Sequence, residues 1–192
     1  MINSNLSKFI TEVDNLRNLV RYQTAPRVSS ETVAEHSYYV TAYVLKLADY
    51  YDFDILKALK MAVLHDFAEA YISDVPHPVK DKFPEISNIL EKAEYDINKE
   101  YISEKFAEDM MEFNECSSPE GCIVSLADIL SVISYSVYEI GLGNSKYMRQ
   151  TLDRGIRRFN RLFDDCKKYL KEGVNPDDIE KEVIDFYKYY VV

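Results

Sequence analysis

The segment that decides the fold covers residues 32–51 and reads TVAEHSYYVTAYVLKLADYY. Its apolar residues recur at spacings of three, four and seven, which is typical of one face of an amphipathic helix. These residues are Val33, Val40, Val44, Leu47 and Tyr51. The segment opens with Thr32-x-x-Glu35, a capping box in which each side chain bonds the other residue's backbone amide. It therefore predicts a helix that begins beside Thr32 and buries one face.

A second helix is expected directly after this segment. Asp54 is placed to cap this helix at its N-terminus. The helix is expected to carry three apolar residues on one face and to run as far as an aspartate. The series is Leu56, Leu59, Val63 and Asp66. Prolines then mark a loop that cannot be helical throughout. They are Pro76, Pro78 and Pro84.

Later segments also favour helix. An apolar stripe is formed by Ile123, Leu126, Leu130, Ile133, Val137 and Ile140, and the segment 141–144 ends it, since its glycines and asparagine accept the left-handed conformation. Before this helix, a long helix is expected over residues 85–114, and residues 117–121 separate the two. After it, two more helices are expected over residues 149–171 and 176–190.

Glycine is absent from the first 120 residues. Neither a P-loop nor a dinucleotide-binding fingerprint is therefore present there, because both need glycine. The absence also favours helices over hairpins, whose tight turns require glycine. With 192 residues and no repeat or linker, the chain is expected to form a single all-α domain over residues 1–192.

Charge and cysteine content exclude several classes of function. The formal net charge of −10 disfavours polymeric nucleic acid and anionic membranes as partners, but not a small phosphorylated substrate. We expect no apolar run near the roughly 20 residues of a membrane span, and the N-terminus lacks the apolar core of a signal peptide, so a cytoplasmic location is expected. Cys116, Cys122 and Cys166 form no Cys-x-x-Cys pair, which argues against a disulfide framework or a thiolate zinc site.

Two histidines and two aspartates are candidate metal ligands. His36 lies on the apolar side of its helix, where a lone histidine is more often an ordinary core residue. His65 and Asp66 follow an apolar run, and Asp128 lies inside another, although a half-exposed ion pair or a solvent-facing aspartate are the alternatives. Buried charges are costly unless they are paired or bound to metal, and this mixed nitrogen and oxygen set suits a divalent first-row ion. Helices that pack in a bundle are able to bring such residues together.

Glu69 stands one turn after His65, on the same helix face. A carboxylate there is placed to exchange a proton with a water at the metal. The alternative is a surface glutamate at a helix end.

In order and spacing, His36, His65-Asp66 and Asp128 resemble the H…HD…D signature of the HD phosphohydrolase superfamily. The finer resemblance is to its bacterial 5′-deoxynucleotidase (YfbR-like) family. It extends over residues 21–144 and includes the pair Arg21-Tyr22 and the segment 74–80. It implies an HD-type helical bundle with the metal site between core helices, and a homodimer.

The resemblance also implies residue roles. His36, His65, Asp66 and Asp128 would hold one divalent ion, with Co²⁺ or Mn²⁺ favoured and Zn²⁺, Fe²⁺ and Mg²⁺ as alternatives. Arg21 resembles the cation that orients the phosphate, and Glu69 the acid/base residue. Substrate contacts are implied at Arg21, Tyr22, His36, Asp74, Val75, Pro76, His77 and Asp128.

Two positions depart from the family pattern. Tyr22 replaces a tryptophan that packs near the sugar's 2′ carbon, which weakens the expected selectivity for deoxynucleotides. His77 replaces a small polar residue, where it either contacts a longer phosphate chain or is solvated.

The expected reaction is metal-dependent hydrolysis of a (deoxy)nucleoside 5′-monophosphate. The nearest rival is a hydrolase of nucleoside triphosphates, for which Arg27, His77 and Lys80 offer extra cationic groups. The rival from another class is a catalytically silent nucleotide- or metal-binding module or a structural helical protein. Such a protein would be expected to lack Glu69, Asp128 or Arg21, and all three are present.

Overall fold

The computed structural model describes residues 6–191, except for the side chains of His77, Pro78, Asp81, Tyr189, Tyr190 and Val191. Within that range the structure is helical and contains no β-strand, only isolated bridges between Val20 and Thr32 and between Tyr51 and Leu170. The predicted all-α class is therefore confirmed.

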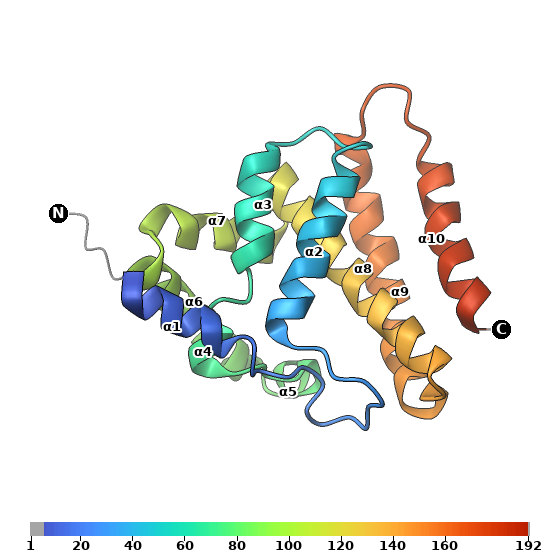
Figure 1. The fold of residues 1–192 in the computed structure, drawn as a ribbon. Helices are drawn as coiled ribbons and strands as arrows, with labels where there is room; N and C mark the ends of the chain where they lie inside the picture. Colours follow the sequence, from blue (N-terminus) through green and yellow to red (C-terminus); the bar gives the residue numbers. More distant parts are fainter. Residues whose placement is uncertain (1–5, 192) are drawn as a thin grey trace.

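The centre of the molecule is α8 (Pro119–Gly141), which packs against α2 (Val33–Leu47), α3 (Ile55–Leu64), α7 (Glu104–Glu115), α9 (Ser145–Cys166) and α10 (Pro176–Val191). Figure 1 shows α2, α3 and α8 side by side, with α10 at one edge. Four further helices lie toward the opposite edge. They are α1 (Leu6–Asn15), α4 (Glu69–Ile72), α5 (His77–Lys82) and α6 (Pro84–Tyr101).

The helix starts follow the local signals in the sequence. Thr32 accepts from the backbone amide of Glu35, and the Glu35 carboxylate accepts from the amide of Thr32, so the predicted capping box is present. Asp54 caps α3 as predicted, and Ser118 caps α8 with Pro119 in its first turn. Because α2 ends at Leu47, Tyr51 does not continue its stripe but pairs with Leu170.

The buried face of α3 differs from the prediction. Leu56 and Val63 are 63% and 48% exposed, whereas Ala58, Met61 and Ala62 are fully buried. The helix also ends at Leu64, so that His65 and Asp66 follow it. Contact with α2 and α8 selects the face that carries Ala58, Met61 and Ala62, which the apolar pattern alone does not reveal.

The long helix expected over residues 85–114 is two helices, α6 and α7. Ser103 adopts extended backbone and accepts from the amide of Phe106, so it caps a new helix where the prediction ran straight through. The helix α1 was not predicted.

Within the described residues one helix, α8, is long and apolar enough by length and composition to cross a membrane, although it contains Glu120, Asp128 and Glu139. This helix has 23 residues and a mean hydropathy of 1.6 over its most apolar window, but 72% of that window is buried inside the protein. Its composition follows from its central place, where helices surround it.

Candidate metal centre and phosphate site

Three core elements bring the predicted metal ligands together. His36 is fully buried in the first turns of α2, His65 and Asp66 directly follow α3, and Asp128 lies on α8. His36 Nε2 is 3.2 Å from His65 Nε2, 3.6 Å from Asp66 Oδ2 and 3.2 Å from Asp128 Oδ1. His65 Nε2 is 3.2 Å from Asp66 Oδ2. His36, His65 and Asp66 therefore converge on one point, and Asp128 lies beside His36.

These separations match those of ligand atoms around one ion. With bonds of about 2.0–2.2 Å, neighbouring ligand atoms of a tetrahedral or octahedral ion lie about 3.0–3.5 Å apart. His36, His65 and Asp66 each offer an atom, and these atoms all lie within 4.8 Å of one another. Asp128 is not in this group of three, but its Oδ1 lies 3.2 Å from His36 Nε2, next to it. The donor set therefore fits a divalent cation.

The second ring nitrogens orient both imidazoles toward this point. His65 Nδ1 lies 2.8 Å from the Ala62 carbonyl oxygen, which only accepts, so Nδ1 carries the proton and donates it. His36 Nδ1 lies 3.1 Å from Ser131 Oγ on α8. With Nδ1 held in this way, each Nε2 is left to face the convergence point, as in known metal sites.

The electrostatics distinguish the two histidines. Burial and the charge of Arg21 lower the pKa of His36 to about 4. Burial would also lower the pKa of His65, but Asp66, Asp128 and the Ala62 carbonyl raise it to about 9. Despite burial, the neighbouring histidines hold the pKa values of Asp66 and Asp128 well below the ordinary range. Without an ion, one proton on His65 therefore offsets part of the negative charge.

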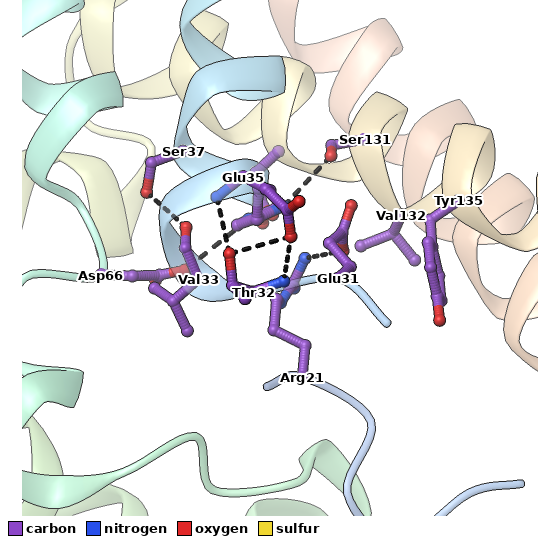
Figure 2. A network of polar contacts seen from close by, with 12 residues as sticks. Arg21, Glu31, Thr32, Val33, Glu35, Ser37, Asp66, Ser131, Val132 and Tyr135 are labelled. Atoms are coloured by element: carbon purple, nitrogen blue, oxygen red, sulfur yellow. Dashed lines mark hydrogen bonds and ion pairs between the residues drawn. The ribbon is translucent and has the colours of Figure 1, made fainter. Parts of the chain in front are cut away.

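Arg21 is held beside this cluster by the start of α2. Its backbone amide donates to the Glu31 carbonyl at 2.9 Å, next to the bridge between Val20 and Thr32. Its Nη1 pairs with Glu31 Oε2 at 3.1 Å, as Figure 2 shows. Although burial opposes its charge, Tyr22, Asp66 and other acidic groups raise the pKa of Arg21, so the guanidinium stays charged.

Glu69, the first residue of α4, has a buried carboxylate oxygen, Oε2, without a hydrogen-bond partner. Burial, with Asp66 and Asp74, raises its pKa well above the ordinary value, while Arg21 and Lys80 act in the opposite direction. A carboxylate with a raised pKa is suited to accept a proton near neutral pH.

The comparisons with known proteins agree with this geometry. The model of the family "5′-deoxynucleotidase YfbR-like" matches residues 8–186. The chain belongs to the YfbR-like 5′-deoxynucleotidase family.

Individual relatives give the same result. A 5′-deoxynucleotidase of Vibrio vulnificus is 31% identical over 73% of this chain and 79% of its own length. An HD-domain phosphohydrolase of Listeria innocua superposes with a TM-score of 0.74 at 17% identity, covering 97% of this chain and 92% of that one. The HD phosphohydrolase DatZ of cyanophage S-2L, solved with dA and one catalytic Zn²⁺ ion, gives a TM-score of 0.60 at 16% identity over 94% and 95%. At these identities the two structures show the HD fold alone.

Tyr22, for which the sequence predicts a departure from the YfbR-like family pattern, has a left-handed backbone with φ 57°. Its ring stacks on Tyr135 of α8, with centroids 4.8 Å apart and planes at 11°, and its hydroxyl is buried without a partner. The Arg21 guanidinium carbon lies 5.3 Å from the ring centroid. Tyr22 thus lies next to Arg21 and against a core helix.

The predicted sugar-contacting loop joins α4 to α5. Ser73 ends α4 with φ 66°, Asp74 acts electrostatically on Glu69, and Pro76 precedes α5. Val75 lies between them and is partly buried. The side chain of His77 lies outside the described residues, so its predicted contact stays a prediction.

Several supporting residues were missed from the sequence. Ser131 orients His36, Glu31 pairs with Arg21, and Arg158 Nη2 lies 3.9 Å from Asp128 Oδ2. Ser131 stands three residues after Asp128, so one helix turn was the available signal. Glu31 and Arg158 had no such signal, because each acts on a residue far away in the chain.

Proposed function

We propose that this chain hydrolyses deoxynucleoside 5′-monophosphates to the nucleoside and phosphate, with one divalent ion held by His36, His65, Asp66 and Asp128. The observation that carries the proposal is the convergence of His36 Nε2, His65 Nε2 and Asp66 Oδ2 at 3.2–3.6 Å, with Asp128 Oδ1 3.2 Å from His36 and the partly buried Arg21 nearby. The family match and the curated 5′-deoxynucleotidases support the substrate class.

The reaction assigns a distinct task to each side chain. When bound, the ion supplies Lewis-acid charge for the phosphate and makes a coordinated water easier to deprotonate. Arg21 presents a planar pair of N–H groups to the non-bridging oxygens and holds phosphorus in line for attack by water. Glu69 takes the proton of that water, and the P–O bond to the 5′ oxygen breaks. The 5′ oxygen takes up that proton from Glu69 and leaves as the hydroxyl of the nucleoside.

The nucleoside end is proposed to lie against Tyr22 and the loop Asp74-Val75-Pro76. Asp74 is partly buried, and its carboxylate is a natural acceptor for a sugar hydroxyl. His36 and Asp128 would contact the phosphate through their place at the ion.

The identity of the ion and the homodimeric assembly are part of the proposal. The ligand set accepts several divalent ions, and the sequence favours Co²⁺ or Mn²⁺, while DatZ carries Zn²⁺. The homodimer, the cytoplasmic location, the absence of membrane and nucleic-acid partners, and the single domain over residues 1–192 stay predictions from the sequence.

Phosphate release tests the proposal directly. Nucleoside mono-, di- and triphosphates, in deoxy and ribo forms, are to be incubated with protein loaded with each of Co²⁺, Mn²⁺, Zn²⁺, Fe²⁺ and Mg²⁺. We expect phosphate release from deoxynucleoside monophosphates. His65→Ala should lose both the ion and the activity. Arg21→Lys should have strongly reduced activity, because lysine keeps the charge but lacks the paired N–H donors of the guanidinium. Arg17→Lys, at an exposed arginine paired with Asp14, is the matched control.

Two results would change the assignment. Far faster cleavage of triphosphates than of monophosphates would replace the substrate class, with Lys80, which acts electrostatically on Glu69, as a cation for the longer chain. Full ion occupancy in His65→Ala, measured by elemental analysis, would overturn the ligand set.

A further inference from the structure

The end of α8 holds the segment that follows Tyr22. Glu139 is 0% exposed, and its carboxylate accepts from the backbone amides of Val28 at 2.8 Å and Ser29 at 2.6 Å. The side-chain amide of Asn144, just beyond the helix, donates to the same carboxylate at 2.6 Å and to the Pro26 carbonyl at 2.9 Å. The tip of the segment 22–30 is thus bonded to one buried acid and its neighbour.

This carboxylate and the loop depend on each other. A buried carboxylate is costly unless hydrogen bonds replace its hydration. Burial by itself would raise the pKa of the Glu139 carboxyl, but the donors Val28, Asn144 and Ser29 lower it below the ordinary value. Glu139 therefore stays charged at neutral pH. The loop amides donate the hydrogen bonds that water would donate to an exposed carboxylate.

The same helix face supports the Tyr22 ring. Tyr135, one turn before Glu139, donates its hydroxyl to the Ser29 carbonyl at 2.8 Å and stacks on Tyr22. Arg27, within the loop, donates to the Tyr22 carbonyl at 3.1 Å and so fixes the left-handed turn. The loop tip and the Tyr22 ring consequently share one support.

Arg21 has a separate support at the base of the loop. The backbone bond to the Glu31 carbonyl and the ion pair with the Glu31 side chain hold it there, and neither involves Glu139. A change at Glu139 should therefore displace the Tyr22 end of the site more than the phosphate end.

We propose that Glu139 is a positioning residue for nucleoside recognition, acting by bonding the loop 26–29 to α8 so that Tyr22 is held against Tyr135. This inference rests on the proposed function, because the nucleoside of a nucleoside 5′-monophosphate is the ligand that Tyr22 would contact. Glu139 itself touches neither the phosphate nor the ion ligands.

The test is Glu139→Gln in the ion-loaded protein. Glutamine keeps the size of the side chain but replaces one acceptor oxygen with an NH₂ group. That NH₂ group would face an N–H donor of the loop or of Asn144, so a hydrogen bond is lost. We expect KM for a deoxynucleoside 5′-monophosphate to rise about tenfold with kcat changed less than about threefold. Inhibition by inorganic phosphate and ion content should stay at wild-type levels, because Arg21 and the ion ligands keep their supports. Hydrogen exchange at the amides of Val28 and Ser29 should become faster.

Ser136→Ala is the matched control, because this fully buried serine on α8 bonds only to the Val132 carbonyl of its own helix. It should leave KM unchanged. If Glu139→Gln does not fold, Tyr135→Phe carries the test, since it removes the bond to Ser29 and keeps the ring; a smaller rise in KM is expected.

The outcomes separate the two proposals. A wild-type protein that neither binds nor hydrolyses deoxynucleotides overturns the proposed function. An active wild type with Glu139→Gln, or its substitute Tyr135→Phe, at wild-type KM overturns the positioning role alone. A weakening of phosphate inhibition as large as the rise in KM also overturns it, because the effect would then pass through Arg21.

Discussion

Glu69 is the residue whose chemistry is least explained by packing. Its Oε2 is buried without a partner, and burial beside Asp66 and Asp74 raises its pKa. An unsatisfied buried acceptor is costly, and this oxygen stays available to accept a hydrogen bond from a ligand or water. The arrangement agrees with the role of proton acceptor proposed for Glu69.

We predict that Glu69→Gln lowers kcat by about 10²–10⁴-fold, since glutamine cannot accept the proton. Ion content and nucleotide binding, measured by elemental analysis and calorimetry, should persist. Glu85→Gln, at an exposed glutamate of α6, is the control and should leave kcat unchanged. Near-normal turnover of Glu69→Gln would exclude this residue from proton transfer.

Tyr22 sets a second prediction at this scale. Its ring lies between Arg21 and Tyr135, and a larger indole would narrow the space left for a 2′ hydroxyl. Tyr22→Trp should therefore raise the deoxy-to-ribo ratio of kcat/KM, by an amount worth no more than about 1–3 kcal/mol. Tyr38→Trp, at a tyrosine 69% exposed on α2, is the control. An unchanged ratio in Tyr22→Trp would remove this residue from the sugar pocket.

At the scale of elements, close helix contact explains both which face of α3 is buried and why a glycine stands at position 121. In α3 the small Ala58 and Ala62 face inward, and the larger Leu56 and Val63 are left outside. Between α7 and α8 the approach is closer still, because a Cβ at Gly121 would overlap the backbone carbonyl of Glu112. Helix contacts of this kind depend on the partner helix, so one helix's own pattern does not predict them.

Gly121→Ala is accordingly predicted to destabilise the protein by about 1–3 kcal/mol, since backbone must move to admit the methyl group. The control is Gly141→Ala at the end of the same helix, where nothing lies within 4 Å of the added atom. Thermal unfolding should show a lower Tm for Gly121→Ala and an unchanged or slightly higher one for Gly141→Ala. Equal Tm values would contradict the close contact.

At the scale of the whole molecule, the candidate ion site joins α2, the end of α3 and α8. An ion that binds only the folded chain adds about 2.7 kcal/mol of stability at 100 times its Kd. It must also displace the proton from His65, whose pKa is about 9 in the ion-free protein. Below that pH the site is protonated, so a rise in pH favours the ion.

We therefore predict that ion affinity rises by up to about tenfold per unit between about pH 6 and pH 8, with close to one proton released per ion. Calorimetry in buffers of different ionisation enthalpy measures both quantities, and the Tm should rise with the ion in parallel. Asp128→Ala should lose most of the Tm rise. A pH-independent affinity would show that His65 carries no proton to displace.

Local signals in the sequence determined where most helices begin and end. Thr32 with Glu35, Asp54, and Pro119 after Ser118 act within one turn, so their effect is readable without a neighbour. The spacing of His36, His65-Asp66 and Asp128 likewise revealed the candidate ligands, because the resemblance to a family preserves order along the chain. Ser103 also acts locally, but it was overlooked inside an otherwise helical pattern.

Only the tertiary structure decided what supports those residues. Glu139 bonds to Val28 and Ser29 across 111 and 110 positions, and Ser131 reaches His36 across 95. The pKa difference between His36 and His65 follows from which charges surround each ring, and the buried face of α3 from which helices lie against it. Such contacts join distant parts of the chain, so the residues next to a position in the sequence do not predict them.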